Sequence, residues 1–192
     1  MSDDPLAGAA VAPPLDGPAA PPPRRRHRWL IDVAAVAALL VLLAYLHTRV
    51  VQVTFVTTGS MLPTIEPGDR LVVHLAAYRK APPRRGDVIA FWDPARGELE
   101  VKRVIAVGGD EVIVGGGMVI VNGQRLDEPY LREPMLREIP LGGRLAEDQL
   151  FVMGDNRNGS EDSRDFGPLA YDRVMGRLVY RILPLNRAGP LK

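Results

Sequence analysis

The chain changes its pattern of apolar and polar positions at about residue 50. Before that point, residues 29–48 read WLIDVAAVAALLVLLAYLHT, an apolar run with a single charged residue, Asp32, near its start. Residues 33–46 within it show no polar stripe, unlike a helix that packs one face on a protein core. A helix of about 20 residues spans roughly 30 Å, the hydrocarbon thickness of a bilayer. The pattern therefore predicts a transmembrane helix at 29–48, and no A-x-A site follows it that would indicate a cleavable signal peptide.

Beyond residue 50 the apolar residues fall into short β-like runs separated by turn residues. The glycines at 115–117 lie between two such runs and predict a hairpin turn. No long amphipathic helix stands out in this part of the sequence. We therefore expect a mostly β domain over 49–192, with strands packed into a barrel-like or sandwich-like core. The runs are 50–56, 70–76, 87–92, 99–107, 111–114, 118–123, 149–154 and 177–183.

The segment before the apolar run is biased in composition. Residues 1–23 are mostly Pro, Ala and Gly, which predicts a disordered tail over 1–28 that ends in the basic cluster RRRHR. Only Arg49 follows the apolar run closely. Because basic residues stay on the cytoplasmic side, we expect a cytoplasmic N-terminus, a single-pass protein of the cell membrane, and an extracytoplasmic domain.

Charge and residue usage exclude several classes of function. The formal net charge is +1, so no overall positive field indicates nucleic-acid binding. The chain has no cysteine, which excludes disulfides, thiol catalysis and cysteine-ligated metal. Its three histidines are His27, His47 and His74, and only His74 falls well inside the predicted domain. We therefore expect no histidine-rich metal site and no cofactor.

The stretch TTGSMLPTIEPGD at 57–69 carries a candidate nucleophile, Ser60. Gly59 frees the backbone beside the hydroxyl, and Pro63 fixes the chain three residues later. This pattern is typical of a side chain that is presented rather than packed. A plain surface turn explains the same residues, since Ser, Gly, Pro and Thr are common in turns.

A serine nucleophile needs a base within hydrogen-bond reach. His74 lies in the strand-like run RLVVHLA, where a structural or surface role is more common. Lys102 stands among apolar residues in LEVKRVIAV, where burial could lower the pKa of an amine toward neutrality. An edge-strand lysine that faces water is the alternative.

A polar loop at 154–167 reads GDNRNGSEDSRDFG. It could be merely solvated. The run Asp162-Ser163-Arg164, however, could set a carboxylate against a guanidinium and fix a site geometrically.

Taken in order, the stretches TGSMLPT, GDVIAFWDP, VKRVIAVGGD and GDNRNGSEDSR resemble type I signal peptidases of bacteria, in the form with a single membrane anchor. Those are membrane-anchored serine proteases that remove signal peptides from exported proteins. The resemblance covers roughly residues 30–185. Several spaced motifs in the right order are more specific than any one of them.

The resemblance implies a role for each matching residue. Ser60 matches the nucleophile and Lys102 the neutral lysine that takes its proton. Thr58 matches a hydroxyl that forms the oxyanion hole together with the Ser60 N–H. Ser160 matches a serine that orients the lysine amine.

In the same polar loop, Asp162 and Arg164 match an ion pair that supports the site, and Asp155 and Asn156 are expected to be architectural. The resemblance also implies cleavage after small residues, as in Ala-x-Ala, through shallow apolar pockets. Three apolar residues flank the proposed dyad and could line such pockets while keeping Lys102 neutral: Val56, Met61 and Val101.

One departure from the family pattern follows the lysine run. The family has Pro-Gly-Asp where this chain has Gly108-Gly109-Asp110, and the loss of the proline is expected to loosen the turn. The partners implied by the resemblance are signal peptides of secreted preproteins, the lipid bilayer and the secretion translocon.

Three other classes of protein share some of these features. Self-cleaving repressors also use a serine and a lysine on a related β fold, but they carry a DNA-binding domain where this chain has its apolar run. A membrane-tethered β domain that binds exported proteins would not require Ser60, Lys102 and the 160–164 loop together. A penicillin-binding enzyme would need Ser-x-x-Lys, and Ser60 is followed by Met-Leu-Pro.

Overall fold

The computed structural model describes residues 28–93, 96–137 and 141–191. The chain divides into two compact units, Met1–Leu40 and Val41–Lys192. The predicted tail lies outside the described residues, apart from Arg28, which begins the first helix.

The apolar run forms one helix, α1 (Arg28–Arg49). Large apolar side chains along it are exposed, among them Leu39, Val41 and Leu43. Within the described part of the chain, no helix is both long and apolar enough to cross a membrane. The helix predicted at 29–48 is therefore present, but the prediction that it spans a membrane is not borne out.

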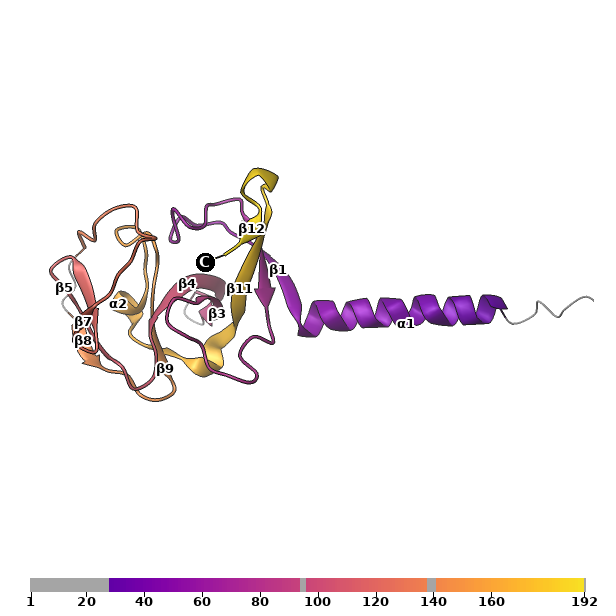
Figure 1. Ribbon diagram of the computed structural model, residues 1–192, viewed down its shortest axis with the longest axis horizontal. Coiled ribbons are helices and arrows are strands. Elements are labelled where there is room, and N and C mark those ends of the chain that lie inside the picture. The colour runs from indigo at the N-terminus through magenta and orange to yellow at the C-terminus, as the bar shows by residue number, and fades with distance from the viewer. Residues whose placement is uncertain (1–27, 94–95, 138–140, 192) are drawn as a thin grey trace, which may run out of the picture. The chain divides into compact units, whose positions relative to one another are not determined.

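The predicted mostly β domain is confirmed, and it contains two sheets (Figure 1). The larger has eight strands in the order β1-β2-β11-β3-β4-β9-β10, with β12 beside β11, and its pairs are antiparallel. Each predicted run for this sheet forms a strand; β2 buries alternate residues, whereas β3, β4 and β9 are buried at consecutive positions. The strands are β1 (Val51–Phe55), β2 (Arg70–His74), β3 (Val88–Asp93), β4 (Glu98–Ala106), β9 (Gln149–Met153), β10 (Leu169–Ala170), β11 (Val174–Leu183) and β12 (Gly189–Pro190).

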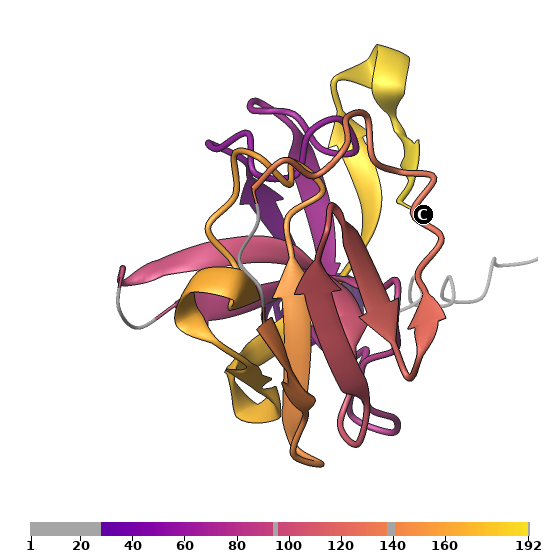
Figure 2. The same cartoon turned by 90° about the vertical axis from the view of Figure 1, so that its left-hand side faces the viewer.

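The smaller sheet has four strands in the order β7-β6-β5-β8 and lies in the foreground of Figure 2. The predicted hairpin at 115–117 joins β5 to β6 and is confirmed: Gly115 pairs with Met118, and the two intervening glycines have φ values of 56° and 72°. Such left-handed backbone is what a two-residue hairpin turn requires. The strands are β5 (Glu111–Gly115), β6 (Met118–Val121), β7 (Gln124–Arg125) and β8 (Leu141–Arg144).

Helices after α1 are short: α2 (Ser163–Phe166), η2 (Tyr171–Arg173) and η3 (Leu185–Arg187).

The strand β4 lies between β3 and β9, so it is an interior strand of the larger sheet. Apolar residues pack against the sheet in clusters that include Val56, Met61 and Ile65 from the loop after β1. This packing fixes the loop on the sheet that carries Lys102.

The turn after β4 corrects one expectation. Gly108 donates its backbone N–H to the Tyr171 hydroxyl at 3.2 Å, a bond that proline cannot make. A Cβ at position 108 would also overlap the Glu147 backbone. The glycine therefore does not loosen the turn, because it permits a close contact between two backbone segments.

Candidate active site

Ser60 lies in the loop that follows β1 and is half-buried. Asn156 holds this loop: its backbone N–H donates to the Ser60 carbonyl at 3.0 Å, and its side-chain amide donates to the Gly59 carbonyl at 3.0 Å. These bonds use backbone oxygens and leave the Ser60 hydroxyl to meet other side chains. The loop is anchored from a distant part of the chain, which favours a presented hydroxyl over a plain surface turn.

Lys102 reaches the Ser60 hydroxyl from β4. Its Nζ donates to Ser60 Oγ at 3.3 Å, and the side chain is buried, with the residue 1% exposed. Because this side chain is buried, the alternative of an edge-strand lysine facing water is wrong. The structure thus brings the predicted nucleophile and the predicted base together across 42 positions of sequence.

Glu100 is a site residue that the sequence analysis missed. Its Oε2 accepts a hydrogen bond from Lys102 Nζ at 2.6 Å, and the carboxylate is largely buried. The amine therefore has a charged neighbour beside the apolar ones that were expected near it. A carboxylate at this distance favours the charged form of an amine, opposite to the effect of burial. The signal was present in the sequence, since residues two apart on a strand share a face.

The other candidate groups around the hydroxyl differ in their geometry. The Thr58 hydroxyl lies 3.4 Å from Ser60 Oγ and is exposed, so it borders the same space as the nucleophile. Its role in an oxyanion hole stays a prediction. His74 belongs to β2 and is not among the recorded hydrogen-bond partners of the Ser60 hydroxyl, which are Lys102 and Thr58.

Ser160 does not make the predicted bond to the lysine amine. Its Oγ is buried, and no hydrogen-bond partner for it occurs in the described residues. The side chain lies instead beside Gly154, where a Cβ would overlap both the Ser160 side chain and the Ser60 carbonyl oxygen. Gly154 thus allows the polar loop to approach the nucleophile loop, a role the sequence analysis did not assign.

Asp162 and Arg164 form an ion pair with both side chains fully buried. Arg164 Nε donates to Asp162 Oδ1 at 2.8 Å, and Arg164 Nη2 donates to Oδ2 at 2.8 Å. Asp162 also caps α2 and accepts the Gly154 N–H at 3.0 Å. The pair therefore holds the backbone at Gly154, next to Ser60. That it supports the site remains a prediction.

A second buried ion pair joins the polar loop to β4. Arg103 donates to Asp155 through Nε at 2.8 Å and Nη2 at 2.7 Å. Thr64, in the nucleophile loop, donates its hydroxyl to the same carboxylate at 2.5 Å. Asp155 and Asn156 thus tie the two loops together, in keeping with their expected architectural part. Arg103 was missed, although it directly follows Lys102 in the sequence.

The Ser60 hydroxyl opens on a small hollow of about 40 Å³. The residues predicted to line substrate pockets all border it: Val56, Met61 and Val101. Val56 and Met61 are buried beneath it, and Val101 is half-buried. Polar residues, among them Thr58 and Glu100, border the same hollow, and its size matches a small side chain.

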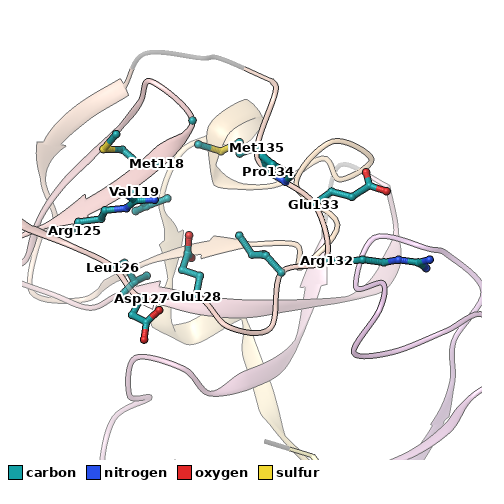
Figure 3. A pocket seen from close by; sticks show the side chains of 12 residues that line it. Met118, Val119, Arg125, Leu126, Asp127, Glu128, Arg132, Glu133, Pro134 and Met135 are labelled. Atoms are coloured by element: carbon teal, nitrogen blue, oxygen red, sulfur yellow. The ribbon is translucent and has the colours of Figure 1, made fainter.

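A larger pocket of about 540 Å³ lies beside β6 and β7 (Figure 3). Charged side chains such as Arg125, Asp127 and Glu133 alternate around it with apolar ones such as Met118 and Met135. None of the predicted site residues lines it. Among the residues that the structure describes, no cluster of three or more carboxylate or imidazole groups could hold a metal ion. The predicted site residues Ser60 and Thr58 border the smaller hollow instead.

Comparison with known proteins gives consistent matches. Residues 27–183 match the family described as signal peptidase, peptidase S26. A signal peptidase I of Leptolyngbya laminosa is 36% identical over 100% of this chain and 97% of its own. A probable signal peptidase I-1 of Synechocystis sp. is 41% identical over 84% of each chain, and a signal peptidase I of Bacillus caldolyticus is 35% identical over 85% of this chain and 92% of its own. The crystal structure of a signal peptidase I from Enterococcus faecalis V583 is 33% identical and covers 50% of this chain and 96% of its own, with a TM-score of 0.46.

Proposed function

We propose that Ser60 and Lys102 form the catalytic dyad of this chain, which belongs to the signal peptidase family, peptidase S26. The chain is a peptidase of the kind that removes signal peptides from preproteins. The observation that carries the dyad is the 3.3 Å distance between Lys102 Nζ and Ser60 Oγ at a hollow that opens to solvent. That distance is within reach of a direct proton transfer once substrate tightens the site.

The proposed reaction is acyl transfer. A neutral Lys102 amine takes the Ser60 proton while Oγ attacks the carbonyl carbon of the scissile peptide bond. The Thr58 hydroxyl and the Ser60 N–H stabilise the oxyanion, and one such donor is typically worth about 2.7–4 kcal/mol. The Lys102 ammonium then gives its proton to the leaving amine, which yields an ester on Ser60. Lys102 next activates a water that hydrolyses this ester and restores the serine.

We infer cleavage after small residues, as in Ala-x-Ala. The support is the hollow of about 40 Å³ bordered by Val56, Met61 and Val101. A methyl side chain fills such a space, while a larger one would displace the buried Met61.

Membrane association belongs to the same proposal. The support is the series of exposed apolar side chains on α1 and the basic cluster that precedes it in the sequence. We propose that the N-terminal tail is cytoplasmic and that the β domain faces the far side of the cell membrane, where preproteins emerge from the translocon. Protease accessibility of the β domain in intact spheroplasts tests this orientation: digestion only after the cells are lysed would contradict it.

The dyad is tested with a preprotein that carries an Ala-x-Ala site, incubated in detergent with wild type, Ser60→Ala, Lys102→Ala and His74→Ala. We expect wild type and His74→Ala to cut after the second alanine. The two dyad variants should lose at least about 10³-fold in kcat/KM, because each removes a group that acts in the transition state. Circular dichroism and thermal unfolding serve as the folding control. Retained cleavage by folded Lys102→Ala would show that the base is elsewhere.

A further inference from the structure

The buried carboxylate of Glu100 is the group closest to the amine of the proposed base. Glu100 and Lys102 lie two positions apart on β4 and therefore on the same face of the sheet. The contact between Oε2 and Nζ is 2.6 Å, shorter than the 3.3 Å between the same nitrogen and Ser60 Oγ. Glu100 is 8% exposed and Lys102 is 1% exposed. The amine thus has one strong partner, and that partner carries a negative charge.

This contact bears directly on the proposed reaction. The amine must be neutral to accept the Ser60 proton, and burial alone would favour that form. A carboxylate within hydrogen-bond distance favours the ammonium instead. The balance between burial and Glu100 therefore decides at which pH the base becomes available.

Other charged groups reach Glu100 from outside the β4 strand. Arg96, in the connection before β4, places Nη1 at 3.3 Å from Glu100 Oε1. The same guanidinium lies 3.9 Å from Glu98, 3.7 Å from Asp93, and in contact with Glu161 of the polar loop. Arg96 therefore partly neutralises the Glu100 carboxylate. Its positive charge also disfavours protonation of the Lys102 amine. Glu100 and Arg96 act on Lys102 in opposite directions.

Orientation of the amine points to the same residue. Ser160, the residue expected to orient it, makes no hydrogen bond in the described part of the chain. If one N–H of the neutral amine donates to Glu100, its lone pair is free to face Ser60 Oγ. Glu100 can therefore fill the part expected of Ser160.

We propose that Glu100 is a positioning residue that anchors the Lys102 amine through their 2.6 Å contact and directs it toward Ser60. Because this rests on the proposed Ser60–Lys102 dyad, it deepens that function. Deprotonation releases the Lys102 proton to solvent as the pH rises, and the neutral amine then accepts the proton of Ser60. Glu100 keeps its charge throughout and exchanges no proton. Removal of the Glu100 charge should therefore change the pH dependence of cleavage.

The test is the dependence of kcat/KM on pH from 5 to 10.5 with an Ala-x-Ala preprotein, since the acidic limb reports the base of the free enzyme. Glu100→Gln keeps the shape and one acceptor but removes the charge. We expect its acidic limb to move down by about 1–3 pH units, so that it cleaves faster than wild type at pH values below the wild-type midpoint. Glu111→Gln is the matched control: it removes the same charge at an exposed position of β5, and its carboxylate is not among the recorded partners of Lys102, Glu100 or Arg96. Its limb should stay at the wild-type midpoint.

A second variant tests the proposal if Glu100→Gln does not fold. Arg96→Gln leaves Glu100 and Lys102 in place and removes the opposing cation, so its limb should move upward. A uniform fall of kcat/KM at every pH, with an unchanged midpoint in Glu100→Gln and Arg96→Gln, would overturn the proposal and indicate a purely structural role. Failure of the dyad itself looks different, because Lys102→Ala would then retain cleavage whatever Glu100 does.

Discussion

The two faces of β4 carry neighbouring cations in different surroundings. On one face, Lys102 meets a single carboxylate, Glu100, and the hydroxyl of Ser60. On the other, Arg103 donates twice to Asp155 and once to the Gly86 carbonyl at 3.0 Å. Both cations are nearly fully buried. The two side chains differ in the number of hydrogen bonds that they donate, and an amine can lose its proton whereas a guanidinium cannot.

The Arg103 face is built to stay charged. Its guanidinium lies 4.1 Å from the centre of the Tyr130 ring, a cation–π contact. Burial, together with the Glu128 carboxylate, raises the pKa of the Tyr130 hydroxyl well above its ordinary range, so that ring stays neutral. An amine with few partners suits proton transfer, whereas a guanidinium with many suits the fixing of loops. The comparison therefore assigns chemistry to one face and architecture to the other.

The largest effect is expected from a reciprocal exchange of the two cations. Lys102→Arg places a group that cannot be deprotonated beside Ser60, and kcat/KM should fall at least about 10³-fold. Arg103→Lys keeps a charge but cannot make both hydrogen bonds to Asp155, so it should cost about 1.5–3 kcal/mol in the free energy of unfolding. At a temperature where it is folded, this variant should retain most of its cleavage. Kinetics and urea unfolding on the same preparations separate the two outcomes.

The opposite results for the two variants would contradict this assignment of chemistry to the Lys102 face and architecture to the Arg103 face. An active Lys102→Arg would show that no proton leaves this position. An inactive but stable Arg103→Lys would show that the second face also takes part in chemistry.

A second effect, measured as a loss of stability, is expected from Asp155→Asn. It leaves the Arg103 guanidinium buried without its counter-ion, which typically costs about 3–5 kcal/mol. The free energy of unfolding from urea denaturation measures this loss. Asp148→Asn, at an exposed position before β9, is the matched control and should change stability by about 0.5 kcal/mol or less. A similar small change in Asp155→Asn would mean that the pair is not the link between the two loops.

Much of the fold follows from local patterns in the sequence. The alternating runs of β2 and β5 each have one face to bury, and the hairpin glycines require left-handed backbone. The two-residue strands β7, β10 and β12 carry too short a pattern to be read. They form because a neighbouring strand offers its backbone, which no local pattern records.

The site divides in a similar way. Motif order indicated Ser60 and Lys102, but their 3.3 Å contact depends on how the loop after β1 packs on β4. The place of Glu100 followed from strand periodicity only once the buried face was known. The orientation of Ser160 and the contact of Gly108 with Glu147 depend on close packing between distant segments, which sequence patterns do not encode.

The smallest effect is expected at the turn that ends β4, where Arg85 donates to Asp110 at 2.8 Å. Burial raises the pKa of the Asp110 carboxyl, but bonds from Arg85, the Val107 N–H and Asn122 outweigh burial and hold this pKa below its ordinary value. A lowered pKa in the folded state adds stability above the unfolded value, and this stability is lost as the pH falls through the folded value. Arg85 is 42% exposed at its side chain, so solvent weakens the pair.

Arg85→Gln should therefore cost about 0.2–1 kcal/mol in the free energy of unfolding at pH 7, well below the loss for Asp155→Asn. The difference from wild type should shrink as the pH falls below about 4, where a protonated Asp110 no longer attracts the guanidinium. Urea unfolding of both proteins at several pH values measures it, and Arg84→Gln, at the exposed neighbouring position, is the matched control. If Arg85→Gln loses as much stability as Asp155→Asn, then the solvent exposure of Arg85 does not make its ion pair weaker than the buried Arg103–Asp155 pair. The contrast between the two pairs would then have to come from their hydrogen bonds rather than from burial.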